Sequence, residues 1–95
     1  RPDPADVAAC RRLLQAGSRS FFAASLLLPP SVREPATVLY AFCRVADDAV
    51  DLSANPETAI AALDARLDAI FAGCPVDDPV DRALAVVVRV HALPR

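Results

Sequence analysis

One predicted helix, over residues 35–52, carries a row of polar side chains suited to binding a metal ion. The row consists of Tyr40, Arg44, Asp47 and Asp51. At about 100° per residue, helical geometry places these four on one narrow stripe, with Asp48 off its centre. The carboxylates of Asp47 and Asp51 lie one turn apart near the C-terminal end of the helix, where they repel each other and the helix dipole disfavours negative charge.

A divalent cation would relieve this repulsion. Mg²⁺ prefers oxygen ligands and is typically held by one or two carboxylates together with substrate phosphates. We therefore predict that Asp47 and Asp51 bind Mg²⁺, with Mn²⁺ as the alternative ion, and that Asp48 lies beside the ligands. Arg44, one turn earlier, is placed to bind a phosphate oxygen on the same metal. The competing interpretation is a solvated acidic helix end.

The residues around the stripe indicate where it points. They are almost all apolar, and they include Val38, Phe42, Val45 and Val50. A helix that is apolar on nearly all sides is typically buried, and acidic residues are seldom buried without a partner. We expect the stripe to line a cavity inside the protein.

A second candidate site is Gly17-Ser18-Arg19-Ser20, where one helix is predicted to end and the next to begin. Ser18, Arg19 and Ser20 offer two hydroxyl groups and a guanidinium group next to the N–H groups of a helix start, which together suit a phosphate. The alternative is that Ser18 is only an N-cap and Arg19 a surface charge. Taken alone, the segment fits the capping interpretation better.

The elements that hold these residues are predicted to be helices throughout. Nine prolines and two glycines separate the periodic segments, and no hairpin signal is present. Asn55-Pro56 and Asp78-Pro79 each place a capping residue before a proline at the first helical position. The pattern predicts an all-α fold with helices at about residues 6–16, 18–28, 35–52, 56–72 and 79–93. An earlier start of the third helix is the alternative, because residues 31–34 resemble a capping box whereas Pro35 disfavours helix at the residue before it.

Composition limits the function classes. The chain has 95 residues, 55% of them hydrophobic, with a mean hydropathy of +0.34. Soluble chains are roughly 45–50% apolar, so we expect some helices to pack against protein outside this sequence. The net charge of −2 argues against nucleic-acid binding. No apolar run approaches the ~20 residues that span a bilayer, so we expect a cytoplasmic protein, with peripheral membrane association as an alternative.

The three cysteines, Cys10, Cys43 and Cys74, form no metal-ligand spacing. Their wide separation and odd number favour reduced side chains that pack in the interior of a cytoplasmic protein.

Three segments together resemble the start of the bacterial phytoene synthases. They are Ser18-Arg19-Ser20-Phe21, residues 26–30 and residues 40–51, and the likeness continues through residues 78–95. Phytoene synthases are members of the head-to-head trans-isoprenyl synthase family, with squalene and dehydrosqualene synthases. The Tyr-x-Phe-Cys-Arg-x-x-Asp-Asp-x-x-Asp block of residues 40–51 is far more specific than a bare pair of aspartates.

The resemblance implies an isoprenoid-synthase-type helical bundle around a hydrophobic cavity, with residues 1–95 as the N-terminal portion of a single domain. It implies a prenyltransferase of carotenoid biosynthesis that joins two geranylgeranyl diphosphates into phytoene through a cyclopropyl diphosphate. By this analogy Asp47 and Asp51 bind Mg²⁺. The residues facing the diphosphate are Ser18, Arg19, Ser20, Tyr40 and Arg44.

One feature of the family is not found in these residues. The second aspartate-rich helix, which completes the metal cluster, is absent, and Asp77, Asp78 and Asp81 look like the start of a helix instead. We therefore expect a fragment that is inactive alone and lacks the C-terminal portion of the fold. The alternatives are a squalene or dehydrosqualene synthase acting on farnesyl diphosphate, a non-catalytic scaffold or assembly relative, and a plain helical interaction module.

Overall fold

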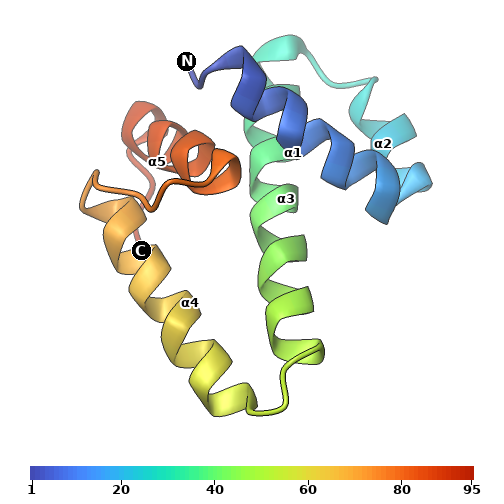
Figure 1. Ribbon diagram of the computed structural model, residues 1–95. Coiled ribbons are helices and arrows are strands. Elements are labelled where there is room, and N and C mark those ends of the chain that lie inside the picture. The colour runs from blue at the N-terminus through green and yellow to red at the C-terminus, as the bar shows by residue number, and fades with distance from the viewer.

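A computed structural model describes residues 1–95 as five α-helices with short connections (Figure 1). The all-α prediction is confirmed. The helices are α1 (Pro4–Gly17), α2 (Arg19–Ser25), α3 (Pro30–Asp51), α4 (Pro56–Phe71) and α5 (Pro79–His91).

Side-chain caps determine most of the helix starts. Asn55 Oδ1 accepts a hydrogen bond from Thr58 N at 3.3 Å, and Asp78 Oδ1 accepts one from Val80 N at 2.9 Å. These caps confirm the predicted starts of α4 and α5. Helix α1 begins two residues earlier than predicted, because Asp3 caps it by the same cap-then-proline arrangement, with Oδ1 accepting from Ala5 N at 2.8 Å.

Helix α3 begins at Pro30, close to the alternative start at residues 31–34, and the start at Pro35 is wrong. Pro35 lies inside the helix and has no N–H group to donate to the Ser31 carbonyl. Ser31 is exposed, so water can satisfy that carbonyl group. A proline near a helix start is therefore tolerated here, and α3 runs for 22 residues.

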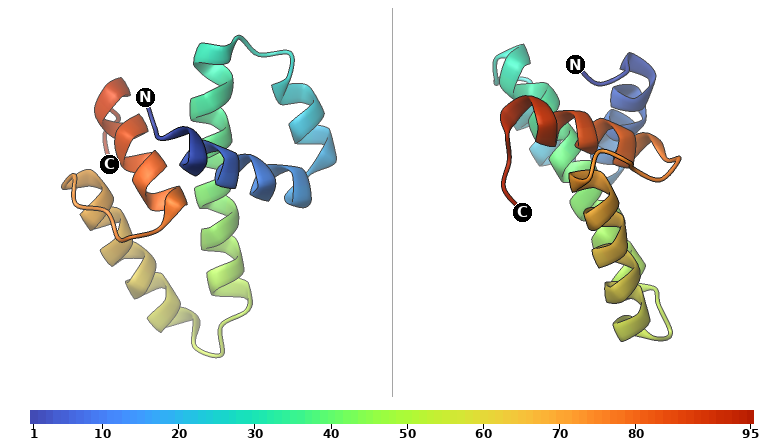
Figure 2. Two further views of the ribbon diagram at one scale, coloured as in Figure 1. Left: turned by 45° about the horizontal axis from the view of Figure 1, so that its top comes forward. Right: turned by 90° about the vertical axis from the view of Figure 1, so that its left-hand side faces the viewer.

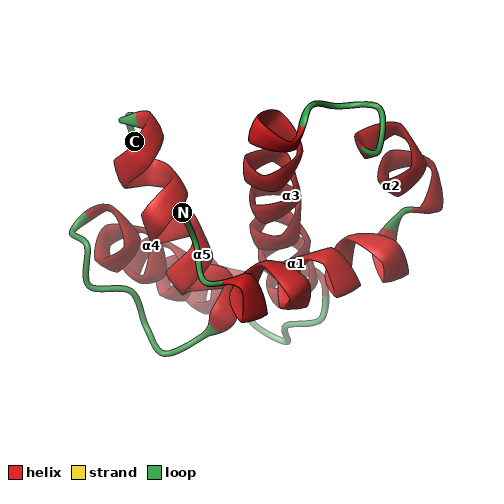
Figure 3. Ribbon diagram, turned by 90° about the horizontal axis from the view of Figure 1, so that it is seen from above, coloured by secondary structure: helices red, strands yellow, loops and turns green.

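The long helix α3 is the axis of the fold. Helix α1 crosses it near its middle, and α5 packs against both α1 and α3 (Figures 1 and 2). Helix α4 returns from the far end of α3 to reach α5, while α2 lies on the other side of α3 (Figure 3). The C-terminal part of α3 extends beyond the crossing with α1 (Figure 1).

The hydrophobic core lies where α1, α3 and α5 meet, with one residue from α4. Its buried members are Cys10, Val38, Ala41, Phe42, Ile70, Val80, Ala83, Leu84, Val87 and Val88. Many other large apolar side chains are exposed, with Leu27 and Leu52 the most so, at 89% and 84%. The surplus of apolar residues noted in the composition therefore lies at the surface of these 95 residues.

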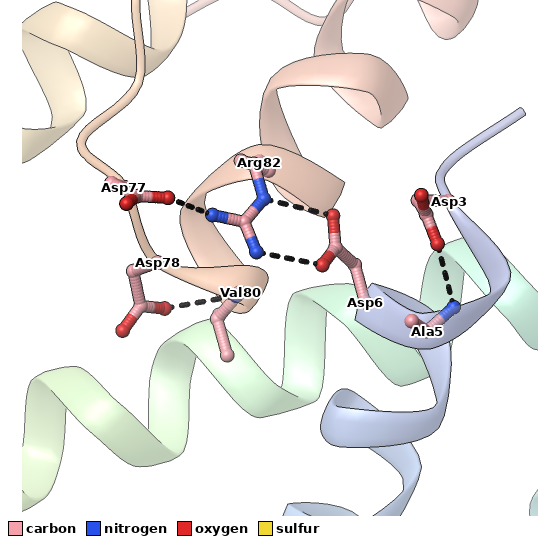
Figure 4. Close-up of polar contacts among 7 residues, drawn as sticks. All are labelled: Asp3, Ala5, Asp6, Asp77, Asp78, Val80 and Arg82. Atoms are coloured by element: carbon pink, nitrogen blue, oxygen red, sulfur yellow. Dashed lines mark hydrogen bonds and ion pairs between the residues drawn. The ribbon is translucent and has the colours of Figure 1, made fainter.

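Two ion-pair groups join the helices around this core. Asp81 is fully buried and pairs with Arg66, whose Nε donates to Asp81 Oδ2 at 3.0 Å and whose guanidinium lies 5.9 Å from the Phe42 ring centroid. Arg82 donates to both carboxylate oxygens of Asp6, at 3.0 and 3.1 Å, and also pairs with Asp77 (Figure 4). The first group links α3, α4 and α5, and the second links the N-terminal ends of α1 and α5.

The cysteine prediction is only partly right. Cys10 is fully buried, whereas Cys43 and Cys74 are exposed, and all three are free thiols. Burial, together with the nearby charges of Asp6 and Asp78, raises the pKa of the Cys10 thiol to about 11. None of the five helices combines the length and apolar character needed to cross a membrane.

The Arg66–Asp81 pair should contribute strongly to stability. Arg66→Ala leaves the Asp81 carboxylate buried without its partner, so we expect the free energy of unfolding to fall by about 3–5 kcal/mol. Urea unfolding followed by circular dichroism measures this loss. Arg1→Ala, which removes the exposed pair with Glu34, is the control and should change stability little. Equal losses in the two variants would contradict this role.

Stability should also fall at alkaline pH because of Cys10. Its folded pKa of about 11 exceeds its ordinary value of 9.0, so its contribution is complete below pH 9 and is lost as the pH rises toward 11. At about 1.4 kcal/mol per pKa unit, the loss is about 2–3 kcal/mol. Urea unfolding measured between pH 9 and 11 should show that the free energy of unfolding falls more steeply with pH for the wild type than for Cys10→Ala. An equal fall in the two proteins would contradict the assignment.

Candidate functional site

The predicted metal-binding stripe lies on the C-terminal half of α3 and is open to solvent. Tyr40 is half-buried, whereas Arg44, Asp47 and Asp51 are exposed. The cavity that we expect around the stripe is therefore not formed by these 95 residues, which leave it open. The buried residues of α3 are Thr37, Val38, Ala41 and Phe42, where α1 and α5 cross it, and the turns beyond the crossing contribute none.

Arg44 is paired with Asp48 rather than with the two predicted ligands. The Arg44 Nε lies 3.5 Å from Asp48 Oδ2, and about half of each side chain is exposed. Helix geometry explains this choice, because residues four apart are neighbours on the helix surface. Asp47 and Asp51 take part in none of the ion pairs of the chain.

Asp47 and Asp51 differ in their surroundings from the other ten of the twelve acidic residues of the chain. Most of the others pair with an arginine. Asp3 and Asp78 cap helices, and Glu57 lies in the first turn of α4, where the helix dipole favours negative charge. Only Asp47 and Asp51 combine a repulsive neighbour, an unfavourable helix end and no compensating cation.

The structure brings Tyr40 to the junction between α1 and α2. Its ring packs against Phe21 of α2 with 5.1 Å between the ring centroids and 30° between the planes. Its hydroxyl group lies directly over Gly17, the last residue of α1. Tyr40 therefore joins the two predicted site segments, because Ser18 follows Gly17 in the chain.

Ser18 is an N-cap, as the alternative interpretation holds. Its N–H donates to Leu14 O at 3.0 Å, and its Oγ accepts a hydrogen bond from Phe21 N at 3.1 Å. The hydroxyl hydrogen remains available to donate to another acceptor. Arg19 and Ser20 are exposed at the start of the seven-residue helix α2.

Arg33 holds α2 against α3, a role that the sequence analysis missed. Its guanidinium donates to three carbonyl groups at the end of α2, those of Ser25 and Leu26 at 3.1 Å each and that of Leu28 at 2.8 Å. Carbonyl groups at a helix end need such donors. The sequence signal was an arginine shortly after the Pro29-Pro30 break, but spacing alone does not identify its acceptors.

The hollows of the molecule lie elsewhere. One of about 580 Å³ lies between the N-terminus, the start of α3 and the end of α5, and its lining includes Pro2, Pro35, Val86 and Val90. Another of about 340 Å³ adjoins it on α3. The stripe residues line neither. No three His, Cys, Asp or Glu side chains are grouped closely enough to hold a metal ion by themselves.

Comparisons with known proteins identify the family. Residues 14–95 match the family model described as squalene/phytoene synthase. The chain is 52% identical to the phytoene synthase of Rhodobacter capsulatus and 48% identical to that of Cereibacter sphaeroides. Each match covers 96% of this chain but only 28% of the relative, so the chain spans little more than a quarter of their length.

The fold is shared with a solved structure. The crystal structure of the squalene synthase HpnC from Alicyclobacillus acidocaldarius superposes with a TM-score of 0.85 at 33% sequence identity, over 95% of this chain and 34% of that one. Sequence and fold agree: the chain belongs to the squalene/phytoene synthase family.

Proposed function

We propose that these 95 residues are the N-terminal portion of a longer prenyltransferase that condenses two geranylgeranyl diphosphates into phytoene. The observation that carries the proposal is the identity of 48% and 52% to two phytoene synthases over 96% of the chain. The likeness to a squalene synthase is weaker, at 33% identity. The protein works in carotenoid biosynthesis in the cytoplasm, and its hydrocarbon product favours peripheral contact with a membrane.

The donor set on α3 fits Mg²⁺, or Mn²⁺ in its place. Asp47 and Asp51 supply two carboxylates one turn apart, and neither is engaged by an arginine. Two carboxylates suffice for Mg²⁺ when substrate phosphates and water complete its shell. Bound there, the ion would neutralise charge on the departing diphosphate of an allylic substrate. Asp48 lies beside these ligands and is balanced by Arg44.

The diphosphate is held by groups on α3 and at the α1–α2 junction. Arg44 exchanges Asp48 for a phosphate oxygen at small cost, because a half-exposed ion pair contributes little. The Tyr40 hydroxyl donates from the same stripe, near the junction. Ser18 donates its remaining hydroxyl hydrogen, and Arg19 and Ser20 are exposed beside it. Helix α2 is short, so these side chains rather than a helix dipole provide the attraction.

The reaction needs more protein than these residues provide. A carbocation requires apolar surroundings that exclude water, yet the stripe and side chains such as Phe21 and Leu39 are exposed. We infer that the rest of a single synthase domain covers this face and that the 95 residues alone are inactive. Product formation by the isolated 95-residue chain would contradict this inference.

Replacing the ligands should abolish most activity of the full-length protein. We expect Asp47→Asn and Asp51→Asn each to slow phytoene formation about a hundredfold or more, because the lost charge interaction is worth several kcal/mol in the transition state. Chromatography of products made from geranylgeranyl diphosphate and Mg²⁺ measures the rate. Glu57→Gln, the same chemical change at an exposed acid on α4, is the matched control and should leave the rate unchanged. Near-normal rates in the aspartate variants would contradict the metal-ligand assignment.

Substrate length is tested in the same assay. Farnesyl diphosphate, supplied alone, should be converted more slowly than geranylgeranyl diphosphate. Faster conversion to dehydrosqualene, or to squalene when NADPH is added as the hydride donor for the final reduction, would contradict the phytoene assignment while leaving the metal-ligand assignment intact.

A further inference from the structure

We propose that Gly17 is a positioning residue: the absence of a side chain there lets the Tyr40 hydroxyl lie over the α1–α2 junction. This inference rests on the proposed function, in which that hydroxyl binds the substrate diphosphate. It gives Gly17 a role that the sequence analysis did not assign to it.

The steric evidence is specific to one atom. A Cβ placed on Gly17 would lie 2.5 Å from the Tyr40 Oη, which is closer than such atoms approach in proteins. The same Cβ would lie 3.4 Å from Cζ and 3.5 Å from Cε1, at or near ordinary contact. A methyl group at position 17 therefore conflicts with the hydroxyl group and hardly with the ring.

The backbone gives no other reason for glycine at this position. Gly73 is the glycine with a positive φ, of 80°, whereas Gly17 lies within the last turn of α1 and Ser18 follows it as the C-cap. Helix α1 ends at Gly17 as predicted, but without the positive φ that is typical of a glycine at a helix end. Glycine in a helix costs about 1 kcal/mol relative to alanine, so alanine would suit α1 better if Tyr40 were elsewhere.

Tyr40 has little freedom to avoid an added methyl group. Phe21 packs against its ring at 5.1 Å. Phe21 is itself held by its N–H bond to Ser18 Oγ, and Arg33 fixes the end of α2 through its three carbonyl contacts. A side chain at position 17 would therefore push the hydroxyl away from the junction, and the effect would reach the diphosphate through Tyr40.

A double-mutant cycle in the full-length protein tests this coupling. The readout is the Kd of inorganic diphosphate with Mg²⁺, measured by calorimetry. Tyr40→Phe removes the hydroxyl and should weaken binding about tenfold, the value of one hydrogen bond to a charged group. Gly17→Ala should weaken it by a similar factor. Adding Gly17→Ala to Tyr40→Phe should change the Kd by less than about twofold, because the conflicting atom is gone.

A second readout follows the ring directly. With 3-fluorotyrosine incorporated at position 40, Gly17→Ala should shift the ¹⁹F resonance, whereas Ala16→Ser, a small change at the exposed neighbouring position, should not. Thermal unfolding should show that all variants remain folded, since alanine favours the helix.

The outcomes separate the two proposals. If the double variant raises the Kd by the product of the two single effects, Gly17 does not act through Tyr40. The same conclusion follows if Gly17→Ala leaves the ¹⁹F resonance of Tyr40 unchanged. If the wild-type protein binds no diphosphate with Mg²⁺, the proposed function fails, and the role assigned to the hydroxyl fails with it.

Discussion

Like charges one turn apart near the C-terminal end of α3 set the main constraint on this protein. The carboxylates of Asp47 and Asp51 repel each other, and the helix dipole adds to the penalty. Arginines elsewhere in the chain pair with half of its acidic residues, including Asp6 and the fully buried Asp81. The pair on α3 receives no such compensation, so a cation from outside the chain is the simplest way to balance it.

The rest of the fold places that stripe beside the residues that we propose bind the diphosphate. Packing of α1 and α5 across the middle of α3 buries that part of the helix and leaves its charged C-terminal end exposed. Arg33 fixes α2 to the beginning of α3. Phe21 and Gly17 then determine where the Tyr40 side chain can lie. Phe21 and Gly17, which carry no charge, thereby set the position of the Tyr40 hydroxyl group.

Local signals made much of this architecture predictable. Asn55-Pro56 and Asp78-Pro79 identified helix starts because a cap and a proline act within a few residues of each other. Helical spacing likewise placed the polar residues of α3 on one stripe. The same reasoning failed at Pro35, because a proline penalty near a helix start is small enough for the surrounding packing to override.

Features that depend on tertiary contacts were not predictable. An apolar helix was expected to be buried, yet the helices of this chain cover only its middle, and Cys43 on α3 is exposed for the same reason. The carbonyl groups bound by Arg33 and the room beside Gly17 depend on how two helices meet, which spacing along the chain does not encode.

The central claim is that a metal-bound diphosphate occupies the stripe on α3. A crystal structure of the full-length protein with Mg²⁺ and inorganic diphosphate tests it most directly. We predict Mg²⁺ at about 2.0–2.1 Å from carboxylate oxygens of Asp47 and Asp51, with Tyr40 and Arg44 facing the diphosphate. Metal and diphosphate bound elsewhere, with both carboxylates still in bulk solvent, would contradict the account.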